Sequence, residues 1–167
     1  AGGIQFNVSA GQTFTENPPA ITADATETDP VIFQKSGTGA NPLIYDESVI
    51  SDDGVLFCDA AAWITFDSID LTDPDISNAV SYYAGFYIKD SDNITVKNCT
   101  ITNYGKYAVY SRYASTNITI QDNDIYFTPE YASTESSIYG INAAYNSAAD
   151  NVLITGNKVH GLKYASS

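Results

Sequence analysis

The sequence predicts an all-β chain folded as a parallel β-helix, which is a solenoid of stacked coils. Its clearest feature is a nine-residue phrase that occurs four times with small changes: WITFDSIDL at 63–71, NITVKNCTI at 93–101, NITIQDNDI at 117–125 and NVLITGNKV at 151–159. Apolar residues alternate in each copy, stop at one polar or small residue, and then resume. Repeated short strands with the same internal break are typical of a solenoid, because each coil must present the same shape to the next.

Each copy of the phrase is expected to supply two short strands separated by a bend. In register, the copies predict two inward columns: Phe66, Val96, Ile120 and Ile154, then Leu71, Ile101, Ile125 and Val159. The residues at the bend belong to types that tolerate a left-handed backbone. They are Ser68, Asn98, Asp122 and Gly156. The following residues should point inward, where stacked Asn side chains would form a hydrogen-bonded ladder. These are Ile69, Cys99, Asn123 and Asn157.

A second short strand precedes each copy and begins at a small residue. These residues are Gly54, Gly85, Ala108 and Gly140. The longer segments 72–83 and 126–139 are expected as loops on one edge of the solenoid. With irregular coils upstream of residue 54, the repeats predict about six coils in a single domain covering residues 1–167. A β-sandwich also has many short strands, but it does not predict near-identical phrases.

The composition limits the partners that the chain can bind. Seven Lys and Arg residues stand against 20 Asp and Glu residues, for a net charge of −13. A nucleic-acid partner is excluded, because binding a polyanion needs a basic surface. Membrane insertion is not expected either, since no apolar run has the length of a membrane span. The charge is compatible with divalent cations, with neutral glycans, or with solubility alone.

The start of the chain suggests a piece of a longer protein. The sequence contains no Met, and AGGIQFNVS lacks the basic and apolar regions of a signal peptide. Neighbouring domains of a parent chain are therefore expected partners.

The two cysteines, Cys58 and Cys99, do not have a metal-binding spacing. A single disulfide is left open, and two unpaired thiols are favoured. In the predicted register Cys99 should be buried at a corner, whereas Cys58 should fall on an outward or turn position.

Lines such as NITVKNCTI resemble the coils of the right-handed parallel β-helix of the pectin lyase-like superfamily. Residues 6–21, 31–44 and 63–71 are similar to β-helix segments of large secreted or surface proteins of Bacteroidetes-type bacteria. The resemblance implies a right-handed solenoid in an extracellular or cell-surface bacterial protein of adhesin-like type. It is specific for the fold and weak for activity, because this superfold hosts lyases, hydrolases, adhesins and passive stalks.

A tyrosine-rich face is the first candidate for binding. Strand alternation should direct Tyr87 and Tyr110 outward, beside loops that bring Tyr82, Tyr83, Tyr126, Phe127, Tyr131 and Tyr139. Aromatic rings on a rigid sheet can stack on sugar rings, and Tyr adds a hydroxyl for hydrogen bonding. The alternative is that Tyr is simply a favourable residue in an exposed strand.

Two cations on the same face are the candidate for catalysis. Lys89 and Arg112 are expected at one level of adjacent coils, with Cys58 and Ala144 as the next neighbours. Polysaccharide lyases of the resembling superfamily use an outward Lys or Arg, where a cation neutralises a uronate and a base removes the adjacent proton. Asp90 and Asp92 could hold Ca²⁺. The stretch DSDN that contains them is equally typical of a turn.

Other polar residues give weaker signals. His160, the one histidine, is expected on the surface. Asp73 and Asp75 are close in sequence, but a catalytic pair of carboxylates is defined by the distance between them, which the sequence does not give. Repeat geometry accounts for most of the four sequons, at Asn7, Asn93, Asn98 and Asn117.

The sequence therefore favours a non-catalytic structural or carbohydrate-binding module of a secreted or cell-surface bacterial protein, with a polysaccharide or other surface glycan as partner. No cofactor is required by this function. The alternative is a polysaccharide lyase that acts on glycans containing uronic acids.

Overall fold

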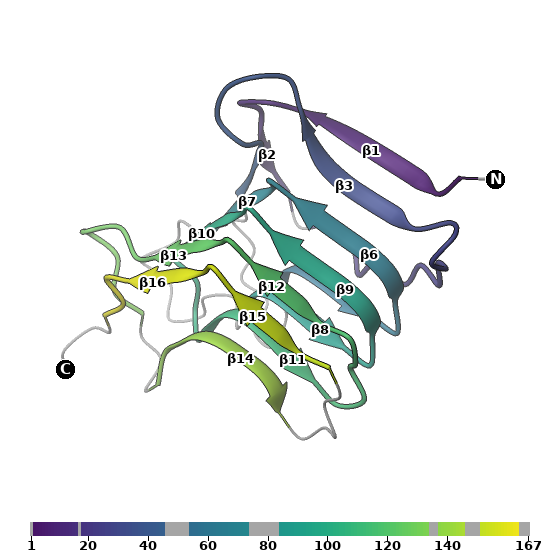
Figure 1. The fold of residues 1–167 in the computed structure, drawn as a ribbon. Helices are drawn as coiled ribbons and strands as arrows, with labels where there is room; N and C mark the ends of the chain where they lie inside the picture. Colours follow the sequence, from purple (N-terminus) through teal and green to yellow (C-terminus); the bar gives the residue numbers. More distant parts are fainter. Residues whose placement is uncertain are drawn as a thin grey trace.

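The computed structural model describes residues 2–16, 18–45, 54–73, 84–133, 137–145 and 151–163. Every regular element in these ranges is a β-strand, and all strand pairs are parallel. The strands form three sheets that run along one solenoid (Figure 1). The described residues include no helix that could cross a membrane.

Sheet A contains six strands, one from each level of the solenoid. They are β1 (Ile4–Ser9), β3 (Val31–Ser36), β6 (Ala62–Asp67), β9 (Asp92–Lys97), β12 (Thr119–Gln121) and β15 (Leu153–Thr155). Sheet B also has six. They are β2 (Thr13–Thr15), β4 (Leu43–Tyr45), β7 (Asp70–Thr72), β10 (Thr100–Thr102), β13 (Asp124–Tyr126) and β16 (Lys158–His160).

Sheet C contains four strands and completes the last four coils. They are β5 (Gly54–Asp59), β8 (Ala84–Lys89), β11 (Tyr107–Arg112) and β14 (Tyr139–Tyr145). Within the described residues, four levels thus carry all three strands, and the two N-terminal levels carry strands of sheets A and B only. The predicted parallel β-helix is confirmed, with about four complete turns where about six coils were expected.

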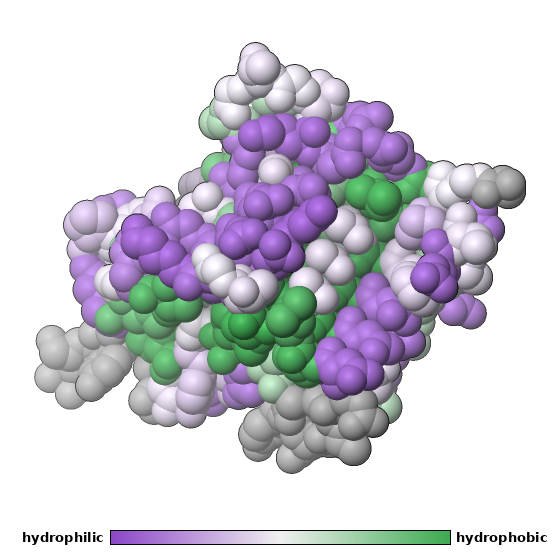
Figure 2. All heavy atoms as spheres, in the orientation of Figure 1, coloured by the Kyte–Doolittle hydropathy of each residue, from purple (hydrophilic) through white to green (hydrophobic). Residues whose placement is uncertain are grey.

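The interior columns follow the predicted register. Phe66, Val96, Ile120 and Ile154 are aligned partners in sheet A, and Leu71, Ile101, Ile125 and Val159 are aligned in sheet B. Phe6 and Phe33 extend the first column, with ring centroids 4.8 Å apart. Central members of the columns are fully buried, whereas Ile154 is 50% exposed. Figure 2 accordingly shows hydrophobic surface over the last coil, formed by β14 to β16.

The bend between sheets A and B has the predicted left-handed backbone. The φ angles are +61° at Ser68, +57° at Asn98, +53° at Asp122 and +66° at Gly156. The asparagine ladder is also present. The Asn123 side chain accepts a bond from the Cys99 N–H at 2.9 Å and donates to Asn157 Oδ1 at 2.9 Å. The ladder supplies partners for backbone groups that the sharp bend removes from the sheets.

The position of Cys58 differs from the prediction. Gly54 is aligned with Ala84 rather than with Gly85, so Cys58 is level with Ile88 and points into the core, only 1% exposed. A one-residue change of register moves every side chain of a strand to the opposite face. The expectation of an outward or turn position for Cys58 is therefore wrong.

The predictions of a buried Cys99 and of two unpaired thiols are confirmed. Burial raises the pKa of both the Cys58 and the Cys99 thiol to about 12. A thiol that stays protonated is a poor nucleophile, so these residues act as core side chains.

The segment before β3 extends sheet C beyond its first strand. The Ile21 N–H donates to the Phe57 carbonyl at 2.7 Å, and the Asp59 N–H donates to the Ile21 carbonyl at 3.0 Å. This segment covers the backbone edge of β5, which would otherwise be open to pairing with another strand.

Candidate functional site

The outer face of sheet C carries the predicted tyrosines, but their rings pack against one another. Phe57, Tyr87 and Tyr110 form one stacked column, with centroid distances of 4.8 and 5.3 Å. Tyr107 stacks on Tyr110 at 4.2 Å. Tyr87 is 7% exposed and Tyr110 is 1% exposed. Ring faces that are already stacked and covered do not present an open platform to a sugar.

Tyr139 also lies on sheet C, where its ring stacks on Tyr107 at 5.2 Å, but the other predicted tyrosines do not gather on this face. Tyr131 is buried in the main core, where its hydroxyl donates to the Tyr104 carbonyl at 3.0 Å. Tyr126 lies on sheet B and stacks on His160 with centroids 5.0 Å apart. Tyr82 and Tyr83 lie outside the described residues. A ligand at the full predicted set stays a prediction, and the described rings do not form one surface.

Lys89 and Arg112 are adjacent on sheet C, as predicted, but both cations are engaged. The Lys89 ammonium lies 3.0 Å from Asp59 Oδ1, and the hydrogen bond to Asp59 raises the lysine pKa. The Arg112 guanidinium lies over the Tyr113 ring at 4.3 Å and hydrogen-bonds to the Tyr87 hydroxyl.

The neighbours expected beside this pair, Cys58 and Ala144, are also wrong. Asp59 is level with Lys89 because of the register of β5. On the other side, a register shift in β14 aligns Tyr145 with Arg112. The carboxylate of Asp59 therefore occupies the place beside Lys89 where a uronate would have to bind.

The carboxylates considered for Ca²⁺ bind protein groups. Asp90 accepts the Ala114 N–H at 3.3 Å. Asp92 accepts bonds from the side-chain amides of Asn93 at 2.7 Å and Asn117 at 2.8 Å, and from the Thr116 hydroxyl. Within the described residues, no three His, Cys, Asp or Glu side chains are grouped for a metal ion. Ca²⁺ binding stays a prediction.

The remaining polar candidates are scattered. His160 lies on the surface, 2.9 Å from Asp124 Oδ1. Asp73 is buried, and Asp75 lies outside the described residues.

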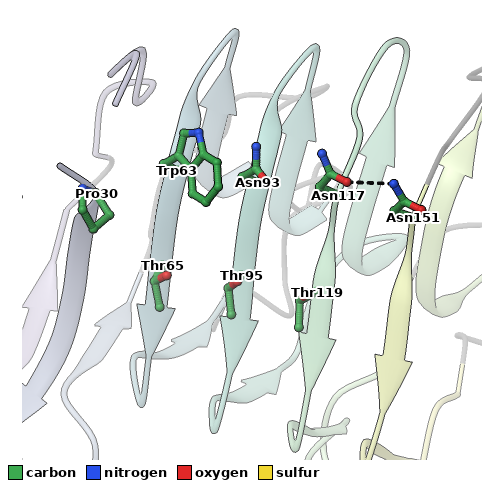
Figure 3. A pocket seen from close by; sticks show the side chains of 8 residues that line it. All are labelled: Pro30, Trp63, Thr65, Asn93, Thr95, Asn117, Thr119 and Asn151. Atoms are coloured by element: carbon green, nitrogen blue, oxygen red, sulfur yellow. Dashed lines mark hydrogen bonds between the residues drawn. The ribbon is translucent and has the colours of Figure 1, made fainter. Parts of the chain in front are cut away.

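A groove that the sequence reasoning missed runs across the outer face of sheet A (Figure 3). It has a volume of about 410 Å³ and is lined by Pro30, Trp63, Thr65, Asn93, Thr95, Asn117, Thr119 and Asn151. Figure 3 shows two rows: the Trp and Asn side chains lie at the start of successive strands, and the Thr side chains lie further along them. Trp63 is the one tryptophan of the chain and is partly exposed.

Hydrogen bonds hold the asparagine row in place. Asn151 Nδ2 donates to Asn117 Oδ1 at 3.0 Å, and Asn117 Nδ2 donates to Asp92 Oδ1 at 2.8 Å. Trp63, Asn93, Asn117 and Asn151 all have a left-handed backbone, with φ between +52° and +62°. The row is therefore a rigid feature of the repeat, and its geometry also accounts for the sequons at Asn93 and Asn117.

The threonine row is open to solvent and uncharged. Thr65, Thr95 and Thr119 are partly exposed, and within the described residues their hydroxyls make no hydrogen bond to a protein partner. The next outward residues, Asp67 and Lys97, form an ion pair at 3.2 Å. The signal that could have located the groove is the outward half of the repeated phrase.

Comparison with known families shows which family this solenoid belongs to. Residues 41–167 match the family model described as a right-handed beta helix region. The chain belongs to this right-handed β-helix family. The match covers most of the chain and agrees with the predicted hand of the coil. No curated protein and no solved structure matches the chain.

Proposed function

We propose that this β-helix is a non-catalytic structural module of a secreted or cell-surface bacterial protein and that it binds polysaccharide in the groove of sheet A. The observation that carries the proposal is the groove itself, in which a partly exposed tryptophan lies beside rows of Thr and Asn. The resemblance to adhesin-like surface proteins of Bacteroidetes-type bacteria and to the pectin lyase-like superfamily supports the localisation.

The chemistry of the lining suits a sugar chain. An indole can stack on a sugar ring and contributes about 0.5–1.5 kcal/mol, as an aromatic pair does. Hydroxyl and amide groups both donate and accept hydrogen bonds, as sugar hydroxyls do. One such contact is weak, so useful affinity would come from repetition along a polymer.

Affinity electrophoresis in gels that contain soluble polysaccharides tests the proposal. We expect the wild-type chain to be retarded by at least one glycan and Trp63→Ala to migrate as it does in a gel without glycan. Tyr139→Ala is the matched control, because this ring is 43% exposed but lies on sheet C. Equal retardation of wild type and Trp63→Ala would contradict the proposed site.

The tyrosine face is compared in the same gels. Retardation that Tyr87→Phe abolishes and Trp63→Ala leaves intact would assign the glycan to sheet C instead. The Phe variant keeps the stacked ring and removes only the hydroxyl, so it should fold.

A polysaccharide lyase at Lys89 and Arg112 is the second candidate, favoured by the adjacency of two cations on one sheet. The ion pair of Lys89 with Asp59 counts against it. A lyase removes the proton beside the uronate carboxylate while the glycosidic C–O bond to the leaving sugar breaks, and the unsaturated product absorbs at ~235 nm. We expect no increase in absorbance at this wavelength when the chain is incubated with pectate, alginate or chondroitin, with or without added Ca²⁺. Product formation that Lys89→Ala abolishes would establish the lyase.

A further inference from the structure

We infer that the groove of sheet A takes a neutral, extended, β-linked polysaccharide that runs across the strands, along the solenoid axis, with one sugar on each coil. This inference rests on the proposed function and specifies its ligand. It draws on the spacing, the charge and the polarity of the groove.

The spacing of the groove matches a polymer of sugars. Successive strands of a sheet lie ~4.8 Å apart, which is close to the advance of one pyranose residue in an extended β-linked chain. The same side chains recur at that spacing, with Asn93 followed by Asn117 and Asn151, and Thr95 followed by Thr119. A ligand whose sugars advance with the coils can place one sugar at each level, whereas a compact or strongly curved chain cannot.

The charge of the groove selects against ionic glycans. None of the eight lining residues is charged. Asp92, which is hydrogen-bonded to the lining residues Asn93 and Asn117, accepts three side-chain hydrogen bonds, and Lys97 is paired with Asp67 at 3.2 Å. A uronate or sulfate would meet no unpaired cation in this groove and would be repelled by the net charge of −13. A cationic sugar would meet no carboxylate among the lining residues.

The polarity of the groove fits sugar hydroxyls. Among the described residues the threonine hydroxyls have no protein partner, so a ligand can bond to them without breaking a protein contact. Trp63 lies next to Pro30 at one end of the rows (Figure 3). Its indole would stack on one sugar of the bound chain. The other levels offer only hydrogen bonds, which specify hydroxyl positions rather than a hydrophobic face.

Trp63 also supplies the measurement, since the emission of the one tryptophan reports directly on the groove. We would titrate the chain with β-linked gluco- and manno-oligosaccharides of increasing length, with an α-linked glucan, with polygalacturonate and with chitosan. We expect an emission change with the neutral β-linked series only. Affinity should rise with length until the ligand spans the four levels that carry Trp63 and the Asn side chains, and should then level off.

Thr95→Val/Thr119→Val is the diagnostic variant, because Val keeps the β-branched shape and removes the hydroxyls. Two lost hydrogen bonds at about 0.7 kcal/mol each correspond to about tenfold weaker binding of the longer oligosaccharides. Thr72→Val/Thr102→Val, on outward positions of sheet B, is the matched control and should bind as wild type does.

The outcomes separate the inference from the proposed function. If emission responds only to polygalacturonate, chitosan or the α-linked glucan, the inference of a neutral β-linked ligand is wrong. The proposed glycan-binding function would still stand. Unchanged affinity of Thr95→Val/Thr119→Val would overturn the alignment of sugars with coils. If no glycan of any class alters emission or gel mobility, the proposed function itself fails.

Discussion

The outer faces of sheets A and C obey the same strand alternation, yet one is open and the other is covered. On sheet C, Tyr87 and Tyr110 point outward but are 7% and 1% exposed. On sheet A, the outward Thr95 and Thr119 remain partly exposed and border a groove. Large rings on neighbouring coils stack and bury one another, whereas small β-branched side chains leave a trough between the rows. An outward position on a solenoid is therefore not necessarily a surface position.

The largest expected effect is a difference in the free energy of unfolding between a variant on sheet C and a variant on sheet A. Tyr110→Ala should lower the free energy of unfolding by about 3–5 kcal/mol, because it removes a buried ring from a stacked column. Trp63→Ala on sheet A should lower it by less than about 1 kcal/mol, since the indole is only partly buried. Urea unfolding followed by circular dichroism measures both.

Tyr110→Phe is the control for the first variant, as it keeps the ring. A small loss for Tyr110→Ala, equal to that of Trp63→Ala, would mean that the aromatic column is exposed in solution. The outer faces of sheets A and C would then not differ in burial.

The next prediction concerns the ladder that holds both faces in register. Asn123→Ala should cost about 2–3 kcal/mol, because it deprives the buried Cys99 N–H and Val96 carbonyl of their partner. Asp122→Ala is less informative, since its left-handed backbone adds strain. The same unfolding titration applies, with Asn157→Ala as the comparison in the more exposed last coil. A larger loss for Asn157→Ala than for Asn123→Ala would contradict the role of burial in the ladder.

Much of the interior could be predicted from the sequence because inward positions repeat. Phe66, Val96 and Ile120 form one column because the pleat and the bend leave them no other place. The bend was equally clear, since Asn98 and Asp122 belong to types that adopt a left-handed backbone.

The error at Cys58 shows where this reasoning stops. The strand GVLFCD has no repeated phrase of its own, and aligning its glycine with Gly85 displaced it by one residue. Only the backbone pairing of Gly54 with Ala84 fixes the face of each side chain, and with it the neighbour of Lys89. A spacing signal alone cannot distinguish the two registers.

The candidate site was harder to predict than the fold, for a different reason. Side-chain direction can be derived from alternation, but exposure depends on what packs above the sheet. Tyr110 is predicted to bind sugar because it points outward, but its buried ring stacks on Tyr87 of the neighbouring coil and on Tyr107 of its own strand. The groove beside Trp63 depends on side-chain size across several levels, which a single strand does not reveal.

A smaller effect is expected from the buried hydroxyl of Tyr104 in the main core. Tyr104 is 1% exposed, and its hydroxyl has no hydrogen-bond partner among the described residues. Burial accordingly raises the tyrosine pKa well above its usual value. Tyr104→Phe should keep the edge contact with Phe127 and raise the free energy of unfolding by about 1 kcal/mol. A loss of stability in urea would show that the hydroxyl has a partner in solution, such as a buried water.

The smallest effect comes from the ion pair that borders the groove of sheet A. Burial raises the pKa of Asp67, but hydrogen bonds from Asn98, Lys97 and Ser68 and the charge of Lys97 outweigh it, so the pKa is lowered overall. The ionised carboxylate thus favours the folded state. Its contribution is complete above the unfolded pKa of about 3.9 and is lost as the pH falls through the lower folded value.

Asp67→Asn should therefore be less stable than wild type by about 0.2–1 kcal/mol at neutral pH, a range typical of partly exposed pairs. The difference should shrink in acid, because the wild-type carboxylate is then protonated too, and it should also shrink at high salt. Urea titrations at several pH values measure it, with Asp59→Asn as the matched change on sheet C. A difference that stays constant into strong acid would assign the role of Asp67 to its neutral hydrogen bonds. In that case the ion pair of Lys97 with Asp67 would contribute nothing to the stability of the fold beside the groove.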